Sequence, residues 1–327
     1  MSGSEEPKKR RRWPQRLLLT FLVLAALAGG GAWWSWKAYT GPGPLAESSN
    51  IVIPRGANIG ETLLSKGAIT DARLFAAATL LTREEGPLRA GEFAFPAQAS
   101  LQQVLDILRH ARPVQRRLTI PEGLVVAQIR VVLENADGLT GELPPFDEGS
   151  FLPETYAYQW GDTRASVLRR GQAAMEQALA QAWAARAPNL PLANAREALV
   201  LASIVERETG VAAERPLVAG VFINRLRRGM PLQSDPTVAY AAARGGVLDR
   251  PLTRADLDAE HPFNTYRIRG LPPAPIASPG REALKAVTQP EATEFLYFVA
   301  DGTGGHAFAR TLDEHNRNVA RWRALGR

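Results

Sequence analysis

Hydrophobic positions are unevenly distributed along the chain, and the longest run of them lies close to the N-terminus. Leu17 to Trp36 reads LLLTFLVLAALAGGGAWWSW and contains no charged residue over 20 positions. A helix rises about 1.5 Å per residue, so this run spans about 30 Å, the thickness of the hydrocarbon core of a bilayer. The pattern predicts a transmembrane helix over residues 17–39.

The flanks of this run indicate how the helix is oriented. Residues 1–16 carry six basic and two acidic side chains, and the positive-inside rule places such a segment in the cytoplasm. Trp33, Trp34 and Trp36 lie at the other end, where aromatic belts occur. A cleaved signal peptide is the alternative, but the run is long for one and no small-x-small cleavage site follows it. We expect a single-pass anchor in the inner membrane, with the rest of the chain periplasmic.

Residues 40–49 read as a Gly-, Pro- and Ser-containing linker, and residues 50–115 then follow the period of strands and helices in turn. The predicted order is strand, helix, helix, strand and helix. Asp71 and Ser100 stand where N-caps of the second and third helices are expected. This order and the phrase IPRGANIGETLLSKG resemble a LysM module, a fold that binds N-acetylated glycans.

Residues 116–327 read as one mixed α/β domain. The segment RLTIPEGLVVAQIRVVLE repeats the strand, turn and helix pattern and marks the start of this domain. Further helices are predicted at residues 165–185, 194–209, 214–229 and 311–326, and a buried strand is predicted at residues 294–301.

Two of these helices carry additional signals. Asn194 and Glu197 have the spacing of a capping box, and Gly210 follows as a stop signal. In the last helix, Leu312 and Trp322 are expected on one apolar face, together with Val319.

Composition and charge exclude several classes of function. The chain has no cysteine, which excludes disulfides, thiolate metal sites and thiol nucleophiles. Of the net charge of +6, +4 lies in residues 1–16, so the remainder lacks the basic face that a nucleic-acid partner requires. The four histidines show no H-E-x-x-H spacing, and neither G-x-S-x-G nor a P-loop occurs. We therefore expect no metal and no cofactor.

Two acidic residues stand at the end of an apolar helical segment, LASIVERETG. Glu206 follows Val205 directly, and Glu208 lies four residues after Ile204. A carboxylate that leaves water costs several kcal/mol unless it is paired or protonated. The residues are therefore either structural partners of an arginine or, in one case, an acid kept protonatable for chemistry, and periodicity cannot choose between the two glutamates.

Three downstream segments contain the residue types of a sugar-binding groove. VFINRLRRGMPLQSDPTVAYA contains Asn224, Gln233 and Ser234, NTYRIRGLPPAPIASPG contains Tyr266, and a Gly-rich loop precedes His306. Amides supply planar hydrogen-bonding groups and aromatic rings supply stacking faces for sugars. Each segment alone would be an ordinary loop.

Together with LASIVERETG and FLYFVADGTGGHAF, these segments resemble the endolytic murein transglycosylases of the YceG-like family over residues 118–327. The resemblance implies an α+β protein, with a transmembrane helix, a LysM-like module and a mixed α/β catalytic domain that contains a glycan-binding cleft. It implies cleavage of the MurNAc–GlcNAc bond of nascent peptidoglycan, leaving 1,6-anhydro-MurNAc ends and limiting strand length. It also implies that the essential acid is Glu206.

A single carboxyl group suffices for that reaction. It protonates the leaving oxygen and then accepts the proton of the substrate's own C6 hydroxyl, which attacks C1. Burial among Leu199, Ala202 and Val205 is expected to raise the pKa of Glu206, and Glu208 is assigned to structure.

The remaining site residues are expected to hold the glycan. Asn224, Gln233, Ser234 and Tyr266 are predicted to bind N-acetyl groups and sugar hydroxyls. Within SFLPETY, which resembles a family segment ahead of the catalytic helix, Glu154 and Tyr156 are further groove candidates.

Two other functions stay open at this point. The chain could be a non-catalytic scaffold that binds glycan and recruits the wall-synthesis machinery. It could also be a true muramidase, for which a second acid would have to face Glu206, with Asp235 or Glu154 as candidates. Glycan strands and the membrane are the expected partners, and a peptidoglycan synthase is a further candidate.

Overall fold

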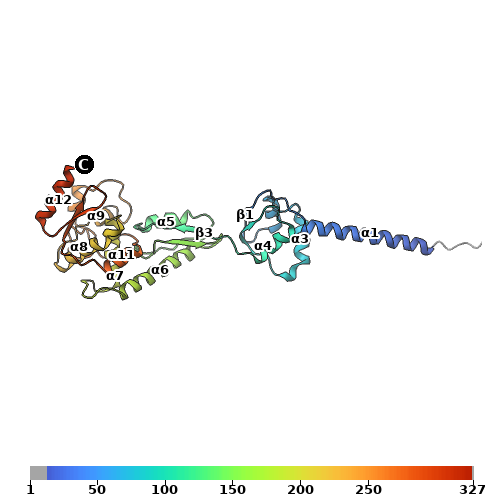
Figure 1. The fold of residues 1–327 in the computed structure, drawn as a ribbon, viewed down its shortest axis with the longest axis horizontal. Helices are drawn as coiled ribbons and strands as arrows, with labels where there is room; N and C mark the ends of the chain where they lie inside the picture. Colours follow the sequence, from blue (N-terminus) through green and yellow to red (C-terminus); the bar gives the residue numbers. More distant parts are fainter. Residues whose placement is uncertain (1–12, 326–327) are drawn as a thin grey trace, which may run out of the picture. The chain divides into compact units, whose positions relative to one another are not determined.

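The computed structural model describes residues 13–325, with side chains from residue 17 onward (Figure 1). Most of the tail predicted at residues 1–16 lies outside this part. The chain divides into two compact units, one up to Val114 and the other from Gln115.

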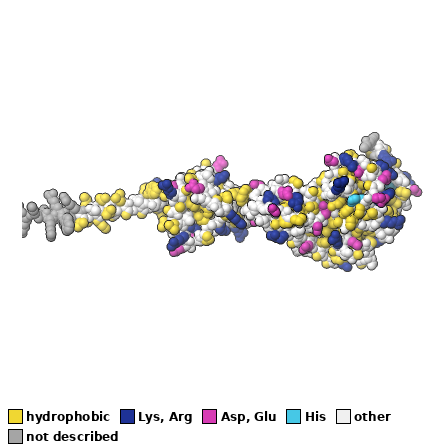
Figure 2. Space-filling model, turned by 180° about the vertical axis from the view of Figure 1, so that it is seen from behind, with side chains coloured by type: hydrophobic (Ala, Val, Ile, Leu, Met, Phe, Trp, Pro, Cys, Tyr) yellow, Lys and Arg dark blue, Asp and Glu magenta, His cyan; other side chains and the backbone are white. Residues whose placement is uncertain are grey.

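The first unit begins with helix α1 (Trp13–Thr40). Its side chains between Leu17 and Trp36 are exposed, with Phe21 at 67% and Trp36 at 66% (Figure 2). Among residues 13–325 it is the one helix that is long and apolar enough to cross a membrane. The predicted apolar helix is confirmed, and its exposure fits a single-pass anchor.

A small α+β fold follows α1. Strand β1 (Ser49–Ile53) pairs antiparallel with β2 (Gly91–Phe95) around a core that includes Phe93 and Leu63. The helices are α2 (Ile59–Ser65), α3 (Ala72–Leu81) and α4 (Leu101–His110), with a short 3-10 turn at Arg83–Glu85. Asp71 and Ser100 cap α3 and α4 through their side chains, as predicted.

The second unit is built around four packed helices. These are α6 (Arg164–Ala184), α7 (Ala195–Glu208), α8 (Arg215–Arg227) and α11 (Arg281–Thr288). Helix α11 packs against the other three. Ahead of them, β3 (Arg116–Thr119) pairs antiparallel with β4 (Thr155–Tyr158), and α5 (Val126–Glu134) lies between these strands in sequence.

The C-terminal elements differ most from expectation. The structure adds α9 (Asp235–Ala242), α10 (Arg254–Asp258) and β6 (His306–Ala309), and it places β5 at Tyr297–Ala300 and α12 at Leu312–Ala324. Strand β5 pairs antiparallel with β6 and is only half-buried, so the prediction of a buried strand is wrong. The apolar face predicted for α12 is also wrong, because Leu312 and Trp322 are 55% and 43% exposed and Asn318 is the buried residue.

Helix α7 shows how local sequence positions the acids. The Asn194 side chain accepts the backbone N–H of Glu197 at the start of the helix, and Ala198 to Val205 form the buried face. The helix ends at Glu208 because Thr209 is extended, with φ of −135°. Both acids therefore lie in the last turn, where the helix dipole disfavours negative charge, so each requires a partner.

Candidate active site

Glu206 and Glu208 project from opposite sides of α7. Each residue turns a helix by about 100°, so a spacing of two separates their directions by about 200°. The two carboxyl groups accordingly contact different residues.

The Glu206 side is an ion-pair cluster. Glu206 Oε1 lies 3.1 Å from Arg215 Nη2, and Oε2 accepts the backbone N–H of Gly280 at 2.9 Å. The same Arg215 nitrogen lies 3.3 Å from Glu122 Oε2. Because the Glu206 side chain is only 4% exposed, a single guanidinium nitrogen joins two carboxylates in a poorly hydrated place.

Glu122 is a residue that the sequence did not identify. It sits in the turn between β3 and α5 and packs against Gly280, the N-cap of α11. A Cβ atom at Gly280 would lie 1.8 Å from Glu122 Oε1, so this approach requires glycine. Burial, and secondly the charge of Glu206, raise the pKa of Glu122. The sequence signal for Glu122 was its place in the IPEG turn, which belongs to a repeated strand, turn and helix pattern. That pattern indicated no role for the glutamate.

The Glu208 side has the opposite electrostatic character. Burial raises the pKa of Glu208 to about 7, against an opposing effect of the Ser234 hydroxyl, which donates a short hydrogen bond to Oε1. The charge of Asp235 raises the pKa further, and that of Arg225 lowers it. Glu208 is partly exposed as a residue, whereas its carboxyl group is buried and protonatable near neutral pH.

A strained loop holds Ser234 in place. The Ser234 N–H donates to Thr265 Oγ1 at 2.9 Å, and the Gln233 N–H donates to the Thr265 carbonyl at 3.1 Å. Gln233 has φ of +51°, a conformation that is uncommon outside glycine and is concentrated at functional sites. Its side chain is exposed and accepts a hydrogen bond from Arg225 at 3.2 Å.

Tyr266 completes this side of the site. Its hydroxyl donates to Asp235 Oδ1 at 2.7 Å, and burial followed by this hydrogen bond raises its pKa. The structure thus brings Gln233, Ser234 and Tyr266, which were predicted to bind the glycan, together beside Glu208.

The other predicted site residues lie in different surroundings. Asn224 donates its amide hydrogens to the carbonyls of Thr293 and Phe295, at 2.7 and 3.1 Å, which leaves no amide donor for a sugar. Glu154 pairs with Arg281 at 2.5 Å. Arg281 directly follows Gly280, which contacts Glu206, so Glu154 lies on the Glu206 side. Tyr156 is a core residue, 8% exposed, whose hydroxyl donates to the Leu152 carbonyl at 2.6 Å.

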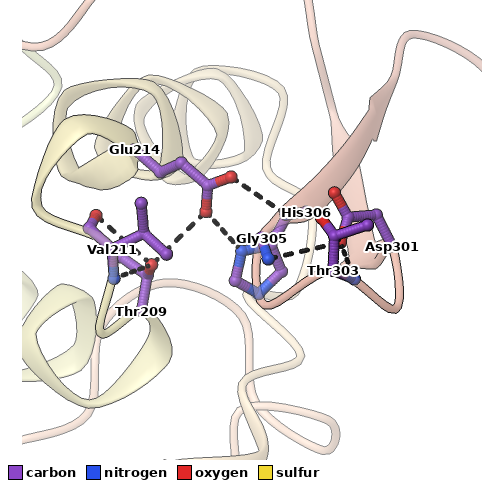
Figure 3. Close-up of polar contacts among 7 residues, drawn as sticks. All are labelled: Thr209, Val211, Glu214, Asp301, Thr303, Gly305 and His306. Carbon is purple, nitrogen blue, oxygen red and sulfur yellow. Dashed lines mark hydrogen bonds and ion pairs between the residues drawn. The ribbon is translucent and has the colours of Figure 1, made fainter.

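A second polar cluster fixes the residues that follow α7 (Figure 3). His306 Nδ1 lies 2.6 Å from Glu214 Oε2, and the His306 N–H donates to Glu214 Oε1 at 2.9 Å. Thr209 donates to the same carboxylate at 3.4 Å. Since Thr209 directly follows Glu208 and Glu214 directly precedes Arg215, this cluster ties both sides of the site to the β5–β6 turn.

Glu148 is another carboxyl group that sequence reasoning missed. Burial raises its pKa to about 7, although its Oε1 accepts the Val126 N–H at the start of α5. The Tyr240 hydroxyl donates to its other oxygen at 3.4 Å.

Within the described residues, no three His, Cys, Asp or Glu side chains are grouped closely enough to hold a metal ion.

Comparison with known proteins extends the resemblance beyond these motifs. Residues 51–321 match the model of the YceG-like family, which includes the small α+β fold as well as the second unit. The endolytic murein transglycosylase of Bacillus subtilis is 36% identical over 52% of this chain and 46% of its own length. That of Streptococcus pneumoniae (strain D39) is 30% identical over 82% of this chain and 57% of its own length.

A solved structure agrees with these relatives. The crystal structure of a YceG-like protein from Listeria monocytogenes is 27% identical, with a TM-score of 0.52, and covers 83% of this chain and 99% of that one. The chain spans about half the length of the two transglycosylases it matches. The family match covers most of its residues, and the chain belongs to the YceG-like family.

Proposed function

We propose that this protein is a membrane-anchored endolytic lytic transglycosylase that cleaves the MurNAc–GlcNAc bond of nascent peptidoglycan. Family membership and the name of its two bacterial relatives support the reaction class. The observation that carries the proposal is the Glu208 carboxyl group, which is buried beside Ser234 at the end of α7 and is protonatable near pH 7.

The geometry favours Glu208 over Glu206 as the acid. A general acid must hold a proton near the working pH, and burial favours the protonated form of Glu208 more strongly than the Ser234 hydrogen bond opposes it. Glu206 instead accepts hydrogen bonds from a cation and a backbone N–H, contacts that suit a carboxylate. The proposal thus differs from the prediction from sequence, in which Glu206 was the acid and Glu208 was structural.

The proposed reaction uses Glu208 twice. Its proton passes to the glycosidic oxygen as the bond from C1 to that oxygen breaks, and the substrate's C6 hydroxyl attacks C1 to form the anhydro ring. The resulting Glu208 carboxylate takes the proton of that hydroxyl, which restores the acid and consumes no water. Ser234 stabilises the carboxylate between the two transfers.

The neighbouring residues have supporting roles in this proposal. The exposed Gln233 and the half-buried Tyr266 are placed to contact N-acetyl groups and hydroxyls along a glycan-binding cleft. Glu206 holds the end of α7 through Arg215, which in turn holds Glu122 and the turn before α5. Glu154 and Asn224 are predicted to affect activity less, because their side chains are engaged elsewhere.

A muramidase is the second candidate, and one observation favours it. The charge of Asp235 acts directly on Glu208, so a second carboxylate is near the proposed acid. A glycosidase that hydrolyses its substrate needs such a partner to activate water or to act as a nucleophile. Asp235 is occupied by the Tyr266 hydroxyl, a contact that a hydrolytic role would have to accommodate.

Product analysis tests the proposal. The full chain in detergent is incubated with purified peptidoglycan, and the released fragments are analysed by mass spectrometry. Anhydro-MurNAc ends are expected from the wild type and are expected to disappear in Glu208→Gln. Reducing MurNAc ends would establish a muramidase, and the absence of fragments from a folded wild-type protein would leave the scaffold function.

We further propose that α1 spans the inner membrane with its N-terminus in the cytoplasm, and that the fold from β1 to α4 is a LysM-like glycan-binding module. The exposed apolar surface of α1 supports the first part. The antiparallel β1–β2 pair, which flanks α2 and α3, supports the second. In this arrangement the enzyme limits glycan length next to a peptidoglycan synthase.

A further inference from the structure

Beyond α1, the two most exposed large apolar side chains of the first unit lie at the end of α3. Leu80 and Leu81, at the end of α3, are 65% and 84% exposed. They are the last two residues of a helix that is apolar overall, ARLFAAATLL, and whose one buried residue is Phe75. Isolated exposed leucines are ordinary, so their position relative to α1 decides whether they matter.

Leu81 lies beside the C-terminal part of α1. It lines an apolar groove of about 320 Å³ with Leu74 of the same helix and with Ala32, Trp36 and Tyr39 of α1. Figure 1 shows α3 beside the end of α1 at which this groove lies. One wall of the groove therefore belongs to the apolar helix itself.

The length of α1 places this groove at the bilayer surface. A span that begins at Leu17 crosses about 30 Å of hydrocarbon by Trp36, since a helix rises about 1.5 Å per residue. The Lys37 ammonium group lies 5.3 Å from the Trp33 ring centre, an arrangement that suits the headgroup region. Leu81 shares a groove with residues on both sides of this level.

We propose that the end of α3, Leu80 and Leu81 together with the adjoining groove, docks on the outer surface of the same bilayer that α1 spans. The surface is continuous with α1, so lipid around the anchor would cover the exposed α1 wall of the groove and Leu81 at once. Amphipathic segments enter the interface in this way with their apolar face. The inference rests on the proposed membrane anchor.

The absence of cysteine makes a direct test possible. Single-cysteine variants of the full chain, Leu81→Cys, Val23→Cys and Leu312→Cys, are labelled with an environment-sensitive fluorophore and reconstituted into liposomes. Val23 reports on the anchor, and Leu312, an exposed leucine of the second unit, is the matched control. Quenching by aqueous iodide is compared with quenching by lipids that carry a nitroxide near the headgroup.

The expected result is a blue-shifted Leu81 probe that shallow nitroxide lipids quench and whose iodide quenching is several-fold weaker than at Leu312. If Val23 is quenched by lipid while Leu81 behaves like Leu312, the docking surface is refuted and the anchor stands. A Leu81 probe that is shielded from iodide but not reached by lipid quenchers would also refute it, in favour of a protein contact. If Val23 is not quenched by lipid, the anchor itself fails and the docking surface with it.

Discussion

At the C-terminal end of α7, two glutamates on opposite sides of the helix have opposite electrostatic surroundings. On the Glu206 side, a buried carboxylate is held by a guanidinium group and a backbone N–H. On the Glu208 side, a buried carboxyl group meets a hydroxyl, with the charge of Asp235 nearby, and its pKa rises to about 7. Burial by itself favours the neutral form of a carboxyl group, and neighbouring cations and hydrogen-bond donors oppose this effect, so burial alone does not make a glutamate an acid.

The largest effect is expected on activity. Glu208→Gln removes the proposed proton donor and should lower the rate of product release by about 10³-fold, within the range for general acids. Glu206→Gln should cost less than about tenfold, because glutamine can still accept the Gly280 N–H. Fragment release from peptidoglycan at pH 6.5 measures both, and an inactive Glu206→Gln beside an active Glu208→Gln would restore the original assignment.

The second effect is expected on stability. Arg215→Met leaves Glu122 and Glu206 without their shared cation, and breaking a buried pair costs about 3–4 kcal/mol. The deficit should be greatest at pH 8 and shrink towards pH 5, as Glu122, whose pKa is raised by burial, takes up a proton. Denaturant unfolding at both pH values measures it.

Arg281→Met is the matched control for this comparison. Its partner Glu154 is partly exposed, so the change should cost about 0–1 kcal/mol. Equal losses in the two variants would show that the Glu206 cluster is not a special support.

The third effect concerns the pH dependence of stability that the Glu208 side is expected to cause. The folded protein holds the pKa of Glu208 at about 7, above its ordinary value of 4.5, so between these values it binds more protons than the unfolded chain. Stability therefore falls as pH rises through this window, by at most about 3 kcal/mol. Glu208→Gln removes this loss and should be more stable than wild type at pH 8, but not at pH 4. Thermal unfolding across this range provides the measurement, and an equal gain at both pH values would contradict the assignment.

The smallest effect concerns Ser234. Its hydrogen bond lowers the pKa of Glu208, so Ser234→Ala should move the alkaline limb of the pH–rate profile upward by less than about one unit. Loss of positioning should reduce the maximal rate by about tenfold, in line with one lost charge-assisted hydrogen bond. In Glu206→Gln the limb should stay where it is, and a shift there instead would couple the two sides.

Local features of the fold were predictable where one segment contained the whole cause. The apolar run of α1 and the caps Asp71, Ser100 and Asn194 are confirmed, because a cap needs only a side chain and the next turn of backbone. The misassigned face of α12 shows the limit of this reasoning. Leu312 and Trp322 have helical spacing, but which face of a surface helix is covered depends on its neighbours.

The site was predictable only in part, for the same reason. Gln233, Ser234 and Tyr266 were identified from their residue types and do gather at one end of α7. Asn224 was identified in the same way, but its amide group donates hydrogen bonds to the backbone carbonyls of Thr293 and Phe295 instead. Glu122 and Glu148 were missed, because a carboxyl group becomes unusual only through contacts with distant segments.

The sequence by itself determined that an apolar helix precedes two folded units, and that two glutamates end a buried helix within a chain of the YceG-like family. Only the tertiary structure decided which groups each glutamate contacts. The partners of Glu206 are Arg215, 9 residues away in sequence, and Gly280, 74 residues away. The partner of Glu208, Ser234, is 26 residues away. Protonation depends on the charges and dipoles within a few ångströms of a carboxyl group, and those distances are set by folding.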